Sequence, residues 1–274
     1  MTDLIINPNT KKNIDFFLKN PSHAVLFHGQ KGLGVDVIAF SAAKKLAGNK
    51  IQLITPDENG KILVDAIRDN VIKIINNTQK TPLAVVISNA DVMNIWAQNS
   101  LLKVLEEPVN NVYFILSAHQ MEKLLPTVCS RTQMIEIMPV PLNETAKLLE
   151  NAKITADKRT KIAFLAGGKP AETLRLLNDE QYYRNMASLA ESAKKFISGD
   201  TYEKLKIISG IKKRDEATDF VQTTASLLLF LSKSRKIPNL AENLEVIEVI
   251  DAVLNNLHQN GNVKAQLTYL ATNL

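Results

Sequence analysis

The stretch HGQKGLGVDV near the N-terminus has the glycines of a phosphate-binding loop but lacks the residues that hold a phosphate. Such a loop follows the pattern G-x-x-x-x-G-K-[ST], whose lysine neutralises the outer phosphates and whose hydroxyl helps to bind magnesium. Gly29, Gly32 and Gly34 permit the tight turn, whereas Val35 and Asp36 occupy the positions of the lysine and the hydroxyl. A unit charge about 5 Å from another is worth roughly 3 kcal/mol at an effective dielectric of about 20, so exchanging a cation for an anion weakens binding strongly. We therefore predict a degenerate loop that binds no nucleotide.

A nucleotide hydrolase also needs carboxylates at the end of a neighbouring strand, where they bind magnesium and activate water. The stretch VVISNADVMN offers Ser88, Asn89 and Ala90 at that place. Asp91 comes late, and we expect it to cap the turn or the helix that follows. An active ATPase with an unconventional site, using Lys31 and Asp91, stays open as the alternative, although Lys31 would have to enter the loop from its opposite side.

The chain offers no pattern of disulfide-forming cysteines or metal ligands. Its one cysteine, Cys129, has apolar neighbours and is expected to be a small core residue. The histidines are scattered instead of paired at ligand spacing: His23, His28, His119 and His258. We expect neither a metal nor a cofactor.

Composition is typical of a globular protein of two or three compact units, with 274 residues of which 45% are hydrophobic. No apolar run approaches the roughly 18 residues of a membrane span, and the N-terminus has no basic segment followed by an apolar one, so we expect a cytoplasmic protein. A net charge of +5 permits contact with nucleic acid, but the lysines are spread through the chain.

Short apolar runs alternate with helical patterns in the first half of the chain. The segments VDVIAFSAAKKLAG, LVDAIRDNVIKIINN and NIWAQNSLLKVLEE have apolar residues at helical spacing. This alternation predicts an α/β domain with a mostly parallel sheet and helices on both faces. The predicted strands are 24–28, 51–55, 83–88, 112–117 and 133–137.

After MPVPLN, whose prolines end the sheet pattern, the periodic segments are helical. We expect three domains: an α/β domain over residues 1–140, a small three-helix domain over 141–178 and an all-α C-terminal domain over 179–274. The helices predicted in the last two are 143–150, 157–166, 170–177, 179–198, 201–209, 215–234, 242–259 and 263–272.

Residues 89–133 contain the stretches NADVMNIWAQNSLLKVLEEP and LLPTVCSRTQ. These stretches resemble the core of the bacterial clamp-loader family, whose pattern is D-A-D-x-M-N-x-x-A-x-N-[AS]-L-L-K-x-L-E-E-P-P, followed later by L-L-x-T-[IV]-x-S-R-C. With ITPDENGKILVDAIRDN and LAGGKPAETLRLL, the resemblance covers about residues 5–180 by motif. It implies a RecA-like domain of the AAA+ superfamily, a helical lid domain and a helical collar domain that joins subunits.

The resemblance implies a stator subunit of the DNA polymerase III clamp loader that is not an enzyme by itself. It places Asn89 and Ala90 where motor relatives have the magnesium-binding Asp and the catalytic Glu. The arginine corresponding to Arg131 reaches the neighbouring subunit's ATP in the family, where a guanidinium stabilises the transferred phosphoryl group, and Ser130 is expected to support the turn. The implied partners are the motor (gamma/tau) and delta subunits in a hetero-oligomeric ring, and through the ring the sliding clamp and primer-template DNA.

Two departures from the family pattern stand out. AKKLAGNKIQLITPD passes directly from a helix to a strand, so the family's four-cysteine zinc module is absent. The family's serine-arginine-cysteine word ends here in Thr132 and keeps the arginine.

Two further features admit more than one interpretation. Neighbouring side chains in a helix diverge by about 100°, so we do not expect Glu106 and Glu107 to act together in acid/base catalysis, and a subunit contact stays open. The basic stretches KKFI, GIKKRDE and KSRK indicate solvated helix surfaces or a collar surface. A free-standing nucleic-acid-binding module remains a third hypothesis.

Overall fold

The computed structural model describes residues 5–69, 81–107, 109–150, 152–233 and 244–274. The chain forms two compact units. One contains residues 1–159 and 166–175, and the other contains 160–165 and 176–274. The three-domain division predicted from the sequence stays a prediction.

Five strands form one sheet in the first unit, in the order β2-β3-β4-β1-β5, and each neighbouring pair is parallel. Their bounds lie within one residue of those predicted, which confirms the parallel α/β domain. The strands are β1 (Ala24–His28), β2 (Ile51–Ile54), β3 (Leu83–Ile87), β4 (Val112–Ala118) and β5 (Gln133–Glu136).

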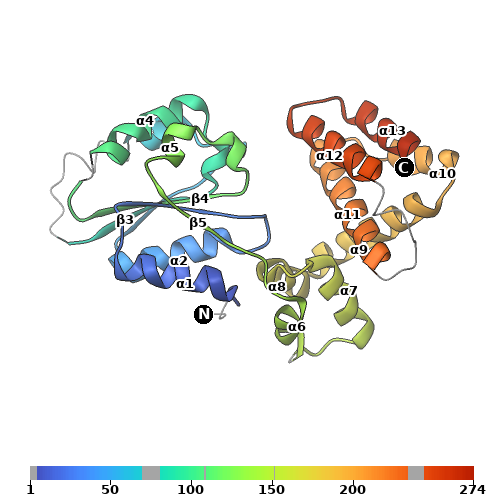
Figure 1. Cartoon of the computed structure of the whole chain (residues 1–274), viewed down its shortest axis with the longest axis horizontal. Helices are drawn as coiled ribbons and strands as arrows, with labels where there is room; N and C mark the ends of the chain where they lie inside the picture. The colour runs from blue at the N-terminus through green and yellow to red at the C-terminus, as the bar shows by residue number, and fades with distance from the viewer. Residues whose placement is uncertain (1–4, 70–80, 108, 151, 234–243) are drawn as a thin grey trace. The chain divides into compact units, whose positions relative to one another are not determined.

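Helices cover both faces of this sheet because its strands are apolar on both sides (Figure 1). In β1, Val25 and Phe27 pack with α1 (Pro8–Lys19) and α2 (Val35–Ala47). Leu26 points to the other face and packs with α4 (Ile95–Glu106). That second face also carries residues 64–69, which are helical, and three short elements. These are η1 (Ala90–Val92), η2 (Met121–Lys123) and α5 (Pro126–Cys129).

Helix α1 has no counterpart in the pattern read from the sequence. Asn7 caps it by accepting a hydrogen bond from the Asn9 N–H, and Pro8 occupies its first position. Phe17 is fully buried and meets Phe27 edge to face at 6.1 Å between ring centroids. The sequence signals that could have predicted this helix are the Asn7 cap, Pro8 at the first position and the apolar residues at helical spacing.

Eight helices follow β5 in the described residues, as the sequence predicts. The predicted helix over 63–77 continues beyond residue 69 into a segment outside the described residues. Across the residues that the structure covers, no helix is both long and apolar enough to cross a membrane. The eight are α6 (Leu142–Glu150), α7 (Ala156–Ala166), α8 (Pro170–Asn178), α9 (Glu180–Ser198), α10 (Thr201–Ser209), α11 (Arg214–Lys233), α12 (Leu244–His258) and α13 (Val263–Asn273).

Candidate functional site

The degenerate loop connects β1 to α2 and depends on its glycines for backbone reasons alone. Gly32 and Gly34 have φ angles of 91° and 86°, in the left-handed region where other residues are strained. Gly29 has no room for a side chain, since a Cβ atom there would lie 2.7 Å from the Ile137 carbonyl oxygen. The conformation of the turn and its close packing therefore explain these glycines, and no bound nucleotide is needed to explain them.

Replacing Gly29 by alanine should destabilise the α/β unit by about 1–3 kcal/mol, because the new methyl group must displace backbone of the strand end beside it. Chemical denaturation followed by far-ultraviolet circular dichroism measures this loss. Gly210 is the matched control, since a Cβ atom there would come no closer than 3.6 Å to another atom and its φ is −78°. An equal effect of both substitutions would contradict the close-packing account.

Val35 stands where a phosphate loop has its lysine, and its side chain is fully buried. It packs into the apolar cluster that joins α2 to the sheet, together with Leu33 and Ile38. The start of α2 therefore supplies packing at the position where a nucleotide-binding relative would present a cation.

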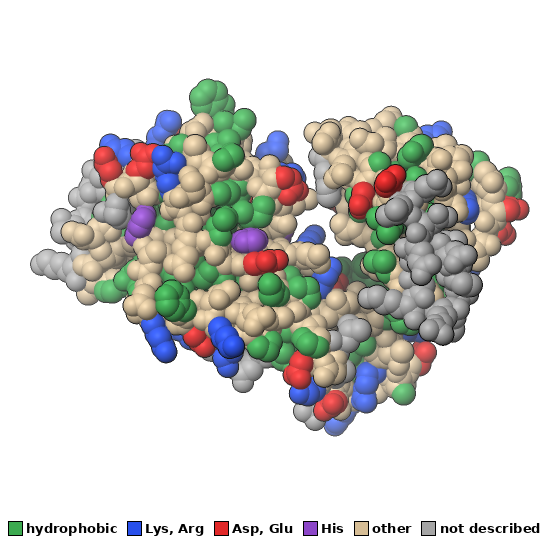
Figure 2. All heavy atoms as spheres, in the orientation of Figure 1, with side chains coloured by type: hydrophobic (Ala, Val, Ile, Leu, Met, Phe, Trp, Pro, Cys, Tyr) green, Lys and Arg blue, Asp and Glu red, His purple; other side chains and the backbone are tan. Residues whose placement is uncertain are grey.

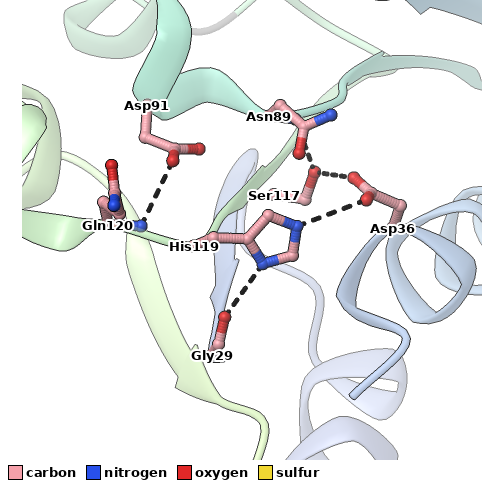
Figure 3. A network of polar contacts seen from close by, with 7 residues as sticks. All are labelled: Gly29, Asp36, Asn89, Asp91, Ser117, His119 and Gln120. Atoms are coloured by element: carbon pink, nitrogen blue, oxygen red, sulfur yellow. Dashed lines mark hydrogen bonds and ion pairs between the residues drawn. The ribbon is translucent and has the colours of Figure 1, made fainter. Parts of the chain in front are cut away.

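Asp36 is held by the end of β4 (Figure 3). Its Oδ1 accepts a hydrogen bond from the Ser117 hydroxyl, and its Oδ2 lies 3.6 Å from His119 Nε2. The Ser117 hydroxyl in turn accepts a hydrogen bond from the Asn89 N–H at 3.0 Å. The carboxylate inside the loop thus has its own partners at the carboxyl end of the sheet.

The ring of His119 bridges two acceptors. Its Nδ1 lies 3.0 Å from the Gly29 carbonyl oxygen, and its Nε2 faces the carboxylate of Asp36. A carbonyl and a carboxylate can only accept, and a neutral imidazole has a single N–H, so the protonated ring satisfies both. The resulting ion pair joins the loop to β4.

Both pKa values shift in the direction that favours this ion pair. The hydrogen bond to Asp36 raises the pKa of His119, against an opposing effect of burial. Burial by itself would raise the pKa of Asp36, but hydrogen bonds with His119 and Ser117 outweigh it and lower that pKa. Both shifts therefore favour the charged forms of the two side chains.

The pair makes stability depend on pH. The His119 contribution is complete below its ordinary pKa of 6.5 and is lost as the pH rises through the raised value. The Asp36 contribution is present above 3.8 and is lost as the pH falls through the lowered value. We expect stabilisation of up to about 1 kcal/mol between these limits, declining above pH 6.5.

Thermal melts of wild type and of His119→Gln between pH 5 and pH 9 test this expectation. The difference in melting temperature should shrink as the pH rises, and Asp36→Asn should remove the same dependence because it removes the other charge. A constant difference between wild type and His119→Gln over this range would show that the pair is not ionised.

The place expected for a magnesium site holds no available carboxylate. Asn89 adopts a left-handed conformation with φ 54°, and Ala90 is fully buried. Asp91 is also buried, and its Oδ2 accepts a hydrogen bond from the Gln120 N–H at 3.2 Å. The predicted capping role of Asp91 is wrong, since Asn94 caps α4 by accepting from the Ala97 N–H. Asn89, the residue after β3 that lines the pocket over the loop, has a neutral side chain.

A small pocket of about 290 Å³ lies over the loop and is lined by Lys31, Gly32, Gly34, Val35, Asp36, Val37, Asn89, His119 and Ala171. This volume is just below the range of about 300–1,000 Å³ that ligand pockets usually have. Lys31 is exposed in this lining. Asp36 and His119, which contact each other, are both part of the lining.

Arg131 is the second residue after the end of α5, and its side chain is 33% exposed. Its Nη1 donates to the Thr127 carbonyl oxygen at 3.0 Å, and its Nη2 lies 2.5 Å from Glu106 Oε1. Ser130 donates its hydroxyl to the same Thr127 carbonyl at 3.2 Å. The roles predicted for Ser130 and Arg131 stay predictions, but both residues sit in a defined turn.

Cys129 packs against the apolar cluster beneath α4 and α5, and burial raises the pKa of its thiol. A protonated, partly buried thiol fits the packing role expected from the sequence. Over the described part of the chain, no group of three or more His, Cys, Asp or Glu side chains could hold a metal ion.

Basic side chains form no single patch on the face shown in Figure 2, where Lys and Arg are scattered among Asp and Glu. Such an arrangement lacks the continuous positive surface that nucleic-acid-binding modules usually present. This face of the molecule therefore gives no support to the hypothesis of a free-standing nucleic-acid-binding module.

Comparison with known proteins finds relatives among the subunits of clamp loaders. A family model described as "DNA polymerase III, delta subunit" matches residues 46–141. DNA polymerase III subunit delta' of Pseudomonas aeruginosa is 29% identical over 206 residues, covering 64% of this chain and 62% of the relative. Replication factor C subunit 3 of Schizosaccharomyces pombe is 26% identical over 176 residues, covering 59% of this chain and 51% of the relative. The chain thus spans about half to three fifths of the length of these two relatives.

Solved structures share the fold at low identity. The gamma subunit-related DNA polymerase III protein of Thermotoga maritima is 17% identical with a TM-score of 0.56, covering 96% of this chain and 97% of that one. A RuvB protein of the same organism is 16% identical with a TM-score of 0.51, covering 85% of this chain and 83% of that one. These similarities confirm the RecA-like AAA+ fold. The family model spans residues 89–133 and confirms the resemblance seen there. The chain is thus similar to clamp-loader subunits of the AAA+ type, among them DNA polymerase III subunit delta' and replication factor C subunit 3.

Proposed function

We propose that this chain is the non-hydrolysing stator of a bacterial DNA polymerase III clamp loader. It would hold no nucleotide of its own and supply Arg131 to the ATP of the neighbouring subunit. The observation that carries the first half of this proposal is the contact of Asp36 with His119, since both residues line the pocket over the degenerate loop. That the chain is a clamp-loader subunit is supported by its similarity to such proteins. The role as a non-hydrolysing stator that supplies Arg131 is our inference.

The charges inside the loop oppose phosphate binding. An entering phosphate meets the carboxylate of Asp36 and finds an apolar side chain at Val35. His119 directs Nε2 at the carboxylate of Asp36 and Nδ1 at the Gly29 carbonyl oxygen, so neither ring nitrogen is left to bind a phosphate. With Asn89 and Ala90 in place of carboxylates, the site also lacks groups that would hold magnesium and orient water.

Arg131 supports the second half of the proposal by its chemistry and place. A guanidinium is permanently charged and presents a planar fork of donors to phosphate oxygens. Arg131 lies on a short turn and is partly exposed, which supports a contact with another subunit. Arginines that act across subunit boundaries accelerate phosphoryl transfer by about 10³–10⁵.

The proposed partners follow from the family. Motor (gamma/tau) and delta subunits would complete the ring, and the sliding clamp and primer-template DNA would be engaged through the whole complex. We propose that the chain is cytoplasmic, because the clamp loader acts in replication of the bacterial chromosome.

Equilibrium binding of a fluorescent ATP analogue to the isolated chain, with and without magnesium, tests the proposal. We expect no saturable binding at micromolar analogue, because Val35 and Asp36 stand in place of the lysine and the hydroxyl that hold phosphate and magnesium. A motor subunit measured in parallel is the positive control. Tight, magnesium-dependent binding by this chain would instead support the active ATPase that uses Lys31 and Asp91.

A further inference from the structure

Glu106 and Arg131 come from different helices and meet at the surface of the first unit. Glu106 ends α4, and Arg131 follows α5, with 2.5 Å between Glu106 Oε1 and Arg131 Nη2. The two side chains are 50% and 33% exposed, respectively. Their contact therefore belongs to the surface and is not needed to fill the core.

Both parts of the guanidinium fork are held. Nη1 faces the Thr127 carbonyl oxygen at 3.0 Å and the Ser130 hydroxyl at 3.4 Å, while Nη2 faces Glu106. Among the described residues, the Nε–H and one Nη2–H have no acceptor. An incoming anion would thus find two donors on a guanidinium whose plane is already set.

The helices that carry the two residues are fixed from below. Leu105 of α4 and Val128 of α5 are buried in the same apolar cluster. A carboxylate in the last turn of a helix is disfavoured by the helix dipole, so Glu106 stands where its charge does not help α4. The ion pair with Arg131 offsets that cost.

We propose that Glu106 is a positioning residue for Arg131. It fixes the guanidinium plane before the neighbouring subunit docks, so that the remaining donors face the partner's nucleotide. This inference rests on the proposed role of Arg131 in trans. Misplacement of a catalytic group by about 1 Å can lower the rate on the order of 10²-fold. Loss of the exposed ion pair between Glu106 and Arg131 should therefore lower the rate less than this, but measurably.

The test is DNA-stimulated ATP hydrolysis by the reconstituted clamp loader containing wild type, Glu106→Ala, Glu106→Gln or Arg131→Ala. We expect Glu106→Ala to lower kcat at the adjacent site about fivefold to tenfold with little change in KM, because transition-state orientation is lost. Glu106→Gln keeps an acceptor oxygen and should stay within about twofold of wild type. In the Arg131→Ala background, Glu106→Ala should cost nothing further, since the two residues act as one unit.

Glu107→Ala is the matched control, because Glu107 is the next residue, exposed, and in no ion pair within the described residues. Equal losses from Glu106→Ala and Glu107→Ala, or faster hydrolysis in Glu106→Ala, would overturn the positioning role. If Arg131→Ala lowers hydrolysis while Glu106→Ala does not, the inference fails and the proposed function stands. If Arg131→Ala changes nothing, the proposed function itself fails.

Discussion

Replacing Arg131 by alanine is expected to slow ATP hydrolysis at the neighbouring motor site on the order of 10³-fold, the lower end of the effect of arginines supplied in trans. The guanidinium stabilises charge that develops on the transferred phosphoryl group, so the loss should appear in kcat and leave nucleotide affinity at that site nearly unchanged. Single-turnover hydrolysis by the reconstituted complex measures this step. The total steady-state rate of ATP hydrolysis by the complex should fall by at least the fraction that this one site contributes.

Assembly must be shown to survive the substitution. Arg131 pairs with Glu106 at the surface, where such pairs contribute only about 0–1 kcal/mol, so Arg131→Ala should fold and assemble as wild type does. Arg184→Ala is the matched control, because Arg184 is exposed and pairs with Glu180 within one helix of the second unit. Equal hydrolysis by the wild-type and Arg131→Ala complexes would reject the role in trans.

Restoring a lysine and a hydroxyl to the loop, by Val35→Lys with Asp36→Thr, should give the isolated chain affinity for ATP on the order of 10²-fold above that of wild type. Each charge change near the phosphates is worth roughly 3 kcal/mol, and part of this is lost in burying the lysine stem where Val35 now packs. Hydrolysis should remain absent, because Asn89 and Ala90 still provide no carboxylate. Titration with a fluorescent ATP analogue and a phosphate-release assay measure the two quantities.

The single variant Val35→Met separates charge from size. Methionine fills a buried position without adding a cation, so Val35→Met should bind no more ATP than wild type. Hydrolysis by the double variant would contradict the view that the end of β3 is also degenerate. Unchanged affinity in a folded double variant would show that the loop backbone itself no longer accepts phosphate.

Most of the first unit could be predicted from the sequence because its signals are local. Strands buried on both faces are continuous apolar runs, and the proline-containing stretch after residue 137 marks the change to helices. Helix α1 was missed because it precedes the first strand and its apolar face is narrow, with Ile14 and Phe17 as the buried large side chains. The short α5 offers too few residues for periodicity to be recognised.

The candidate site was only half predictable. Gly29, Val35 and Asp36 identify a degenerate loop by their spacing, but they do not reveal what Asp36 contacts. Its partners Ser117 and His119 are about 80 residues away in the chain, and they become neighbours only because β4 pairs with β1. Ser117 and His119 at the end of β4 were the available signal. They could predict the contact with Asp36 only if the order of the strands were already known.

The same limit applies to Arg131. Its position could be read from a short motif, whereas its contact with Glu106 depends on how α4 and α5 pack beneath the surface. The sequence treats Glu106 and Glu107 alike, as two glutamates ending a helix. Only the fold separates them, because one reaches the arginine.

Photo-crosslinking tests most directly whether this chain serves a neighbour's nucleotide and not its own. The reconstituted clamp loader would be labelled with an ATP analogue that carries a photoreactive group on its γ-phosphate, and the labelled peptides of this chain identified by mass spectrometry. We predict label in residues 124–131, the tryptic peptide that ends at Arg131, and its loss when the neighbouring motor subunit cannot bind ATP. Label within residues 29–36, in the complex or in the isolated chain, would contradict the account.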